Sequence, residues 1–281
     1  MKNLSLSRYK TVKGNINIDL LSNIDKNVYD DLLAKENLFF DFLTISNLYK
    51  ITELNLKEIF QSIINLEKRL IEEKILILIE SDSEKLNINR FLLNYLFSFR
   101  TYIDHLETFI NREFGKDSEE MKDWVILKSK VHLENFVYRF MYKLRNYAQH
   151  CGMPIDIFEI SSSIVNNEYS VQINIGFDPQ GLLSKFDSWG SALKVELQNS
   201  DIINLEDSIR DFGLLVKQFD SWFYKLITPF IEAINAKIES IIGKNDLKES
   251  KLCISFNNED EKLCLVDSVF RSISQLENNY K

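Results

Sequence analysis

The residue types best suited to chemistry in this 281-residue chain gather in residues 145–150, which read Arg-Asn-Tyr-Ala-Gln-His. The guanidinium of Arg145 can bind phosphate oxygens and stabilise negative charge that develops on them. The imidazole of His150 can take a proton from a ribose 2′-hydroxyl or give one to a leaving oxygen. The amide of Asn146 can orient either group. Together these side chains suit phosphodiester cleavage that requires no metal.

Further cations and aromatic side chains lie on the same predicted helix. At about 100° per residue, one stripe of that helix carries two histidines, two amides and two cations. Phosphates can bind Arg139 and Lys143, and bases without a pairing partner can stack on Tyr142 and Tyr147. We therefore expect these four residues to bind RNA. The stripe comprises His132, Asn135, Arg139, Lys143, Asn146 and His150.

The same residues also have a structural explanation. A histidine in the last turn of a helix is stabilised by the helix dipole, by about 0.3–1 kcal/mol when it is exposed. The stripe from Arg139 to Asn146 is then a solvated face opposite an apolar one. Spacing alone leaves both interpretations open.

The pattern Arg145-Asn146-x-x-x-His150, late in a long helix of a helical region, resembles the HEPN superfamily signature. That signature is an arginine, a polar residue and then a histidine, and many members are metal-independent endoribonucleases. The resemblance implies that Arg145 and His150 are catalytic, that Asn146 supports them, and that no cofactor is needed. It covers residues 56–150 and 205–242. The wider run 138–152 also looks like an uncharacterised group of bacterial proteins.

The resemblance also implies partners. HEPN proteins usually dimerise so that two motif helices line one RNA-cleaving groove, and they are common in toxin–antitoxin and phage-defence systems. We therefore expect RNA, a second copy of the chain, and an antitoxin or defence-system protein as partners. The alternative is a non-catalytic helical scaffold or binding subunit that uses the Arg139–His150 face.

The spacing of Arg145 and His150 occurs once more, at Arg100 and His105. Because Arg100 and Asp104 are four residues apart on a predicted helix, an ordinary ion pair accounts for both. The functional alternative is an auxiliary pair, in which His105 approaches His150 from a neighbouring helix.

Composition limits the class of protein. Hydrophobic residues make up 45% of the chain, with 8 Gly and 3 Pro, which is typical of a globular protein. The formal net charge of −8 argues against a broad non-specific nucleic-acid surface. The three cysteines form no CxxC pair, so we expect no metal site. The longest aliphatic run, residues 75–79, is far shorter than the roughly 20 residues of a spanning helix. The N-terminus lacks the apolar core of a signal peptide, so we expect a cytoplasmic protein with no membrane partner.

The patterning predicts a mainly α protein: a HEPN-like helical bundle with short β-hairpin additions. Residues 1–24 form an N-terminal segment with a strand at 15–20, and residues 25–245 form the bundle. A β-hairpin interrupts the bundle at about 156–177, and residues 246–281 form a C-terminal hairpin and tail. The predicted helices are 25–43, 56–80, 87–113, 124–150 or 129–150, 182–197 and 205–242.

Several boundaries have specific signals. Gly152 and Pro154 end the motif helix, and Asn87 or Asn89 caps the start of the helix 87–113. Pro229 kinks or divides the helix 205–242. In the C-terminal hairpin, residues 252–256 pair with 263–265 and Cys253 faces Cys264. Two reduced thiols are favoured there, with a disulfide as the alternative.

Overall fold

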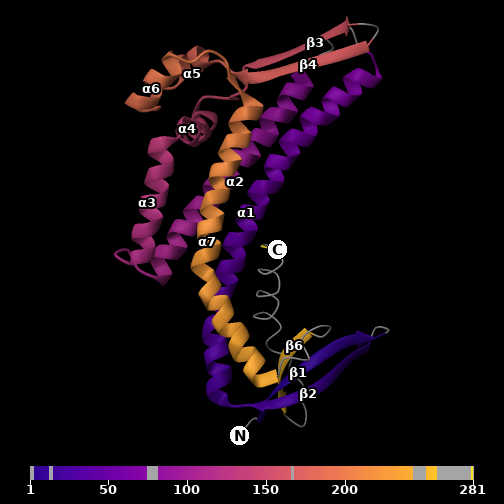
Figure 1. The fold of residues 1–281 in the computed structure, drawn as a ribbon, viewed down its shortest axis with the longest axis vertical. Helices are drawn as coiled ribbons and strands as arrows, with labels where there is room; N and C mark the ends of the chain where they lie inside the picture. The colour runs from indigo at the N-terminus through magenta and orange to yellow at the C-terminus, as the bar shows by residue number, and fades with distance from the viewer. Residues whose placement is uncertain are drawn as a thin grey trace. The chain divides into compact units, whose positions relative to one another are not determined.

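The computed structural model describes residues 3–12, 15–74, 82–165, 168–242, 251–257 and 280. Seven helices and six strands lie in these ranges, which confirms the predicted mainly α architecture with short hairpins (Figure 1). The chain forms two compact units, one from residues 1–47 and 222–281 and the other from residues 48–221. None of the helices in the described ranges has an apolar stretch that could cross a membrane.

The first unit contains an antiparallel sheet of three strands in the order β2-β1-β6. β2 (Asn15–Ile24) includes the predicted strand at 15–20 and pairs with β1 (Asn3–Val12), which the sequence did not predict. β6 (Lys251–Asn257) also pairs with β1, so that Cys253 lies opposite Ser7. The predicted partner strand at 263–265, with Cys264, lies outside the described residues.

The two longest of the described helices are each continuous. α1 (Lys26–Glu72) joins the predicted segment 25–43 to the first part of the predicted segment 56–80, of which residues 75–80 lie outside the described residues. α7 (Leu205–Ile242) has its predicted bounds and continues through Pro229 rather than dividing there. In the second unit, α1 and α7 approach closely at Gly213, where a Cβ atom would lie 2.8 Å from Leu56 Cδ2. Close approach of the two helices explains the glycine.

α2 (Asp82–Glu113) begins five residues before its predicted start, so the prediction of Asn87 or Asn89 as its N-cap is wrong, because both lie inside the helix. The Asn89 side chain is buried inside the helix, where its Nδ2 donates to the Lys85 carbonyl. Its Oδ1 accepts the backbone N–H of Ile155 at 3.1 Å. A buried amide needs such partners, so Asn89 connects α2 to the segment that follows the motif helix.

The predicted helix 124–150 is two helices, α3 (Glu119–Glu134) and α4 (Phe136–His150). They are separated at Asn135, whose backbone is extended at φ −122° and ψ 112°. The break changes the phase of the helical pattern. A continuous helix over 129–150 would place Leu133 on the buried face with Leu144, and Tyr138 beside Arg145. In the structure Leu133 is 76% exposed and Tyr138 is buried.

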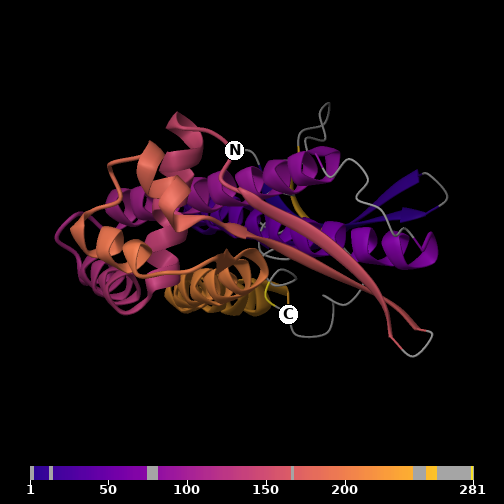
Figure 2. The same cartoon turned by 90° about the horizontal axis from the view of Figure 1, so that it is seen from above.

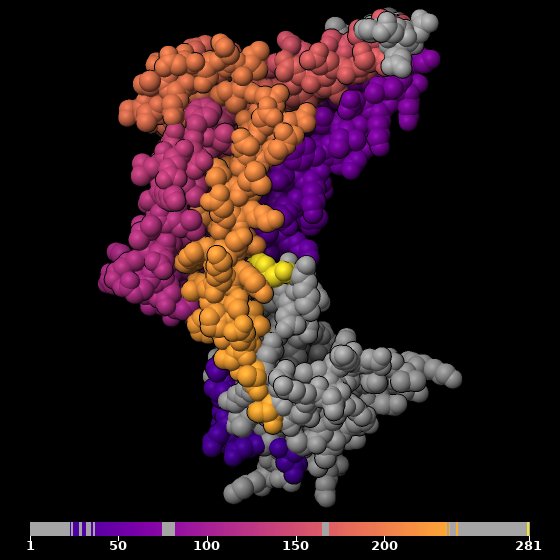
Figure 3. Space-filling view, in the orientation of Figure 1, coloured from indigo at the N-terminus to yellow at the C-terminus, as the bar shows by residue number. Residues whose placement is uncertain are grey.

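Aromatic side chains from three helices form the core of the second unit around Phe212 of α7, which is fully buried. The Phe212 ring lies 4.6 Å from Phe99, 5.8 Å from Tyr95 and 5.9 Å from Tyr138, measured between centroids. Two turns further along α7, Phe219 contacts Trp124 of α3 at 5.3 Å. α3 and α4 therefore pack on α7, and their surfaces adjoin (Figure 3).

A second aromatic cluster joins α4 to the segment after it. β3 (Ile157–Val165) and β4 (Glu168–Phe177) form the predicted hairpin, seen as a long ribbon in Figure 2, and β5 (Ile203–Asn204) pairs with β4. The predicted helix 182–197 is divided into α5 (Pro179–Lys185) and α6 (Ser191–Gln198). Trp189 lies buried between them and stacks on Phe140 of α4.

Phe212→Ala should lower the free energy of unfolding by about 3–5 kcal/mol, because it removes the ring that α2 and α4 share with α7. Leu214→Ala, at a 60% exposed position of the same helix, should change it by no more than about 0.5 kcal/mol. Denaturation in urea, followed by circular dichroism, measures both. Equal effects of the two substitutions would contradict this account of the core.

Candidate functional site

The motif helix α4 ends as the sequence predicts. Its buried face consists of Tyr138, Phe140, Met141, Leu144 and Tyr147. The backbone N–H of Cys151 donates to the Tyr147 carbonyl at 2.8 Å, and Gly152 follows with φ +140°. A positive φ favours glycine, so the chain turns away from the helix axis directly after His150.

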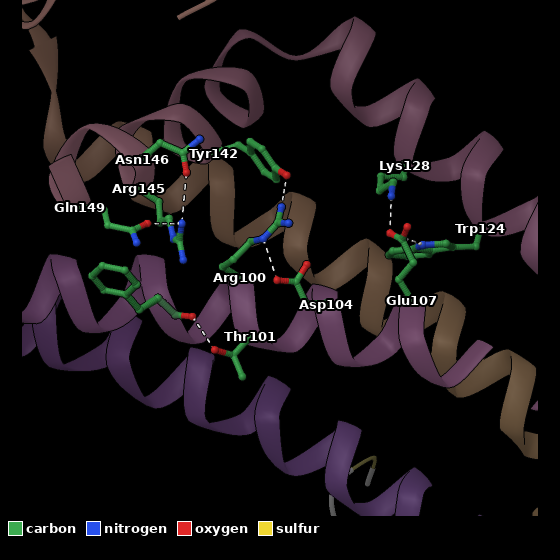
Figure 4. A network of polar contacts seen from close by, with 11 residues as sticks. Arg100, Thr101, Asp104, Glu107, Trp124, Lys128, Tyr142, Arg145, Asn146 and Gln149 are labelled. Atoms are coloured by element: carbon green, nitrogen blue, oxygen red, sulfur yellow. Dashed lines mark hydrogen bonds and ion pairs between the residues drawn. The ribbon is translucent and has the colours of Figure 1, made fainter. Parts of the chain in front are cut away.

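Arg145 is held in place by neutral groups (Figure 4). Its Nη1 donates to Gln149 Oε1 at 2.5 Å and to Asn146 Oδ1 at 3.2 Å. Its guanidinium carbon lies 5.1 Å from the centre of the Phe97 ring on α2. Its buried Nε has no acceptor among the described residues. The guanidinium is therefore positioned on one side by amide oxygens and on another by an aromatic ring.

The positive charge of Arg145 is not neutralised by a carboxylate among the described residues, in contrast to that of several other arginines. Arg69, Arg100 and Arg139 each form an ion pair with a carboxylate. Within the described part of the chain, Arg145 forms no such pair. Because amide oxygens carry no net charge, they fix the guanidinium without neutralising it. A positive charge that is partly buried and uncompensated attracts an anion more strongly than one in bulk water.

His150 is exposed as the last residue of α4, and none of the described residues forms a hydrogen bond with its imidazole. It follows Arg145 by five residues, which places the two side chains about 140° apart around the helix axis. The fold thus brings Arg145 and Asn146 into contact but leaves His150 on a different side of the same helix end. Lys143, also predicted to bind RNA, is half-buried on α4.

Two residues predicted to bind RNA are used in packing. Arg139 forms an ion pair with Glu196 of α6 at 2.5 Å and donates to the carbonyls of His132 and Leu133 at the end of α3. Its side chain is only 14% exposed. Tyr147 is 1% exposed and its ring stacks on Trp189. Neither side chain presents a free face to a ligand, so neither is retained in the site.

The auxiliary candidates lie on α2. Arg100 Nε donates to Asp104 Oδ2 at 2.8 Å, which confirms the ion pair predicted from spacing. Arg100 Nη1 also donates to the hydroxyl of Tyr142, and its guanidinium carbon lies 4.9 Å from the centre of that ring. His105 is exposed, and its side chain has no hydrogen-bond partner within the described ranges.

Helical spacing places Gln149 beside Arg145, because the two residues are four positions apart, and the structure confirms this contact. A second partner of Arg145 was missed by the sequence reasoning. Phe97 lies on α2, and nothing local in the sequence indicates that its ring reaches Arg145.

A pocket of about 720 Å³ lies between α2, α3 and α4, beside Arg100 and Tyr142. Glu107 accepts hydrogen bonds from Lys128 Nζ and, at 3.4 Å, from Trp124 Nε1 (Figure 4). Burial alone would raise the pKa of Glu107. The bond and charge of Lys128, with smaller contributions from Trp124 and Arg100, lower that pKa below its usual value. Burial, with the charges of Arg139 and Lys143, lowers the pKa of His132.

The described residues bring together no group of three or more His, Cys, Asp and Glu side chains that could hold a metal ion. Comparisons with protein-family models, with curated proteins and with solved structures found no match for this chain.

Arg139→Ala should lower the free energy of unfolding by about 2 kcal/mol, because it removes a mostly buried ion pair and two bonds to the end of α3. The exposed pair of Arg210 and Asp207 offers a matched control, and Arg210→Ala should cost at most about 0.5 kcal/mol. Urea denaturation measures both. An Arg139→Ala protein of unchanged stability would show that the side chain is free for another role.

Lys128→Met should raise the pKa of Glu107, because burial then acts without the opposing charge and hydrogen bond. The ionised carboxylate stabilises the folded wild type, since its folded pKa lies below its ordinary value of 4.5. The pH-dependent stability difference between wild type and variant is therefore complete above the raised Glu107 pKa of the variant and disappears as the pH falls through the lowered folded pKa of the wild type. Carbon-13 NMR of the Glu107 carboxyl and urea denaturation at several pH values test this. A difference that grows below pH 4.5 would contradict it.

Proposed function

We propose that this chain is a HEPN-like, metal-independent endoribonuclease whose site lies at the C-terminal end of α4. The observation that carries the proposal is the environment of Arg145. Its guanidinium is fixed by Gln149, Asn146 and Phe97, yet no carboxylate in the described ranges neutralises it. A positioned, uncompensated guanidinium suits the charge that builds up on a phosphate during cleavage.

In this mechanism, His150 accepts the proton of a ribose 2′-hydroxyl. The 2′-oxygen attacks the adjacent phosphorus, and Arg145 stabilises the negative charge on the phosphorane oxygens. The bond to the 5′-oxygen of the next nucleotide then breaks, and that oxygen takes up the proton that His150 removed, either directly or through water, so that His150 returns to its neutral form. The products are a 2′,3′-cyclic phosphate and a free 5′-hydroxyl. Asn146 acts as a positioning residue, because it contacts Arg145.

The angular separation of the two catalytic groups supports a site shared by two copies. On one helix Arg145 and His150 point about 140° apart. A groove in which Arg145 of one protomer faces His150 of its partner would bring both groups to one phosphate, and a two-fold axis would generate two such sites. A cytoplasmic toxin or phage-defence effector with a cognate antitoxin fits this activity.

The assay compares cleavage of cellular RNA by wild type, Arg145→Ala and His150→Ala, with a chelator present. Arg210→Ala serves as the matched control. Wild type and Arg210→Ala should cleave equally, and either motif substitution should reduce the rate by at least 100-fold, on the order of the loss of one catalytic group. Equal products from all four proteins, or none from folded wild type, would reject the enzyme.

Mixing the two inactive variants tests the shared site. A heterodimer of Arg145→Ala and His150→Ala contains one site with both substitutions and one site with neither, so mixing should restore cleavage. If each chain instead supplies its own Arg145 and His150, no intact site forms and the mixture stays inactive. Subunit exchange is verified by native mass spectrometry with one labelled variant.

A non-catalytic helical scaffold or binding subunit is the second candidate. It is favoured by the use of Arg139 and Tyr147 in packing, since both belong to the face that was expected to bind RNA. This candidate predicts that folded wild type binds a partner through Arg145 or Lys143 without cleaving RNA. The cleavage assay and a binding assay on the same variants separate the two.

A further inference from the structure

The pocket between α2, α3 and α4 has no role in the proposed cleavage, because neither Arg145 nor His150 lines it. Each helix contributes different chemistry to its wall. α2 supplies Arg100, Asp104 and Glu107, α3 supplies Lys128, and α4 supplies Tyr142. Its volume of about 720 Å³ falls within the range of small-molecule sites, roughly 300–1,000 Å³.

Hydrogen bonds fix the orientation of the polar side chains in this pocket but leave some of their donors and acceptors without a partner among the described residues. Glu107 Oε2 accepts from Lys128 and Trp124, while Glu107 Oε1 has no donor among the described residues. Asp104 Oδ2 accepts from Arg100, while Asp104 Oδ1 has no donor in the same ranges. Lys128 Nζ donates one N–H to Glu107 and has two more. Each of these side chains is thus held by at least one hydrogen bond and can form another with a ligand.

The charges of the pocket cancel, since Arg100 and Lys128 oppose Asp104 and Glu107. Cancellation disfavours a bare anion or a metal cation as the ligand. It suits a neutral, planar group that presents donors and acceptors side by side. The guanidinium of Arg100 lies over the ring of Tyr142, which forms a flat surface on which such a group can stack.

From these contacts we propose that the pocket binds a guanine base. Guanine carries the acceptor O6 next to the donor N1–H, with the N2 amino group beyond it. The bonded pair Lys128 and Glu107 offers the complementary order, a donor adjacent to an acceptor. Lys128 Nζ donates to O6 and Glu107 Oε1 accepts from N1–H and N2–H, while the base stacks beside Arg100 and Tyr142.

The other bases fit this pair less well. Adenine presents an acceptor at N1, which would face the Glu107 carboxylate, and an amino donor where Lys128 needs an acceptor. Cytosine likewise places an amino donor toward Lys128. Uracil offers one N–H between two acceptors and therefore gives Glu107 one bond rather than two. The pocket should consequently distinguish guanine from adenine through Lys128 and Glu107.

The guanine can come from a free nucleotide or from single-stranded RNA, and two titrations separate these sources. One compares guanosine and adenosine monophosphates by calorimetry. The other uses single-stranded oligoribonucleotides with and without one guanine. Binding in either arm should be at least tenfold tighter with guanine. Fluorescence of Trp124 should change as well, because its indole touches Glu107, and Trp124→Phe should remove that signal while calorimetry still detects binding.

Three variants test how the base is read. Glu107→Gln should reduce guanine affinity to the level of adenine, because the amide has only one acceptor oxygen, and its NH2 group must then face either Lys128 or the N–H groups of the base. Tyr142→Leu should weaken all bases at least fivefold and keep the guanine preference. Glu67→Gln, an exposed carboxylate on α1 outside the pocket, should change neither. Circular dichroism and thermal melts establish that each variant is folded.

The proposal is overturned if folded wild type binds no guanine ligand in either arm, binds all bases equally, or retains its preference in Glu107→Gln. It is tested separately from cleavage, since guanine binding should persist in Arg145→Ala and His150→Ala. Guanine binding by a wild type that does not cleave RNA would support the guanine pocket and reject the ribonuclease proposal. RNA cleavage by a wild type that binds all bases equally would support the ribonuclease and reject the guanine pocket.

Discussion

The interruption at Asn135 is the constraint on which both the site and the pocket depend. Its extended backbone ends α3 and begins α4, so the two helices can lie at an angle and pack on different parts of α2 and α7. The interruption is stabilised from both sides. Asn135 Nδ2 donates to the Val131 carbonyl at 2.9 Å. The Arg139 guanidinium donates to the carbonyls of His132 and Leu133 and forms an ion pair with Glu196.

The change of direction also determines which side chains are buried. In a straight helix Tyr138 would lie beside the cations, and Leu133 would face the core. In the folded chain Tyr138 contacts Phe212 and Phe219, and Leu133 faces solvent. Tyr142, one turn further along, then meets Arg100 at the edge of the pocket. The extended backbone of Asn135 thus determines which side chains of α3 and α4 are buried and which are exposed.

Sequence patterning predicted those features whose signals are local. The apolar spacing of α2, the stop at Gly152, the hairpin after it and the pair of Arg100 with Asp104 all depend on residues close together in the chain. The division at Asn135 escaped prediction because no Gly or Pro marks it and its stabilising partner, Glu196, lies 57 residues from Arg139. The pairing of β1 with β6 escaped for the same reason, since those strands come from opposite ends of the sequence.

The candidate site divides in the same way. The contact of Arg145 with Asn146 and Gln149 follows from helical spacing, so the chemistry at the helix end was accessible from sequence. The burial of Tyr147 depends on Trp189 and Phe186, which lie in the loop between α5 and α6. The role of Phe97 beneath Arg145 depends on how α2 and α4 cross. Contacts between distant segments therefore decide which members of a motif remain exposed.

The contacts that hold the segment after α4, including that of Asn89 with Ile155, have a consequence for His150. Beyond the helix end, the chain is fastened three times within six residues. Cys151 Sγ contacts the Lys185 carbonyl, Ile155 N–H donates to Asn89, and the Asp156 carbonyl accepts from Lys85. An imidazole on a frayed terminus would lose conformational freedom each time it met a substrate. Here the backbone on both sides of His150 is already ordered by folding, so only the rotation of its side chain is left to be restricted on encounter.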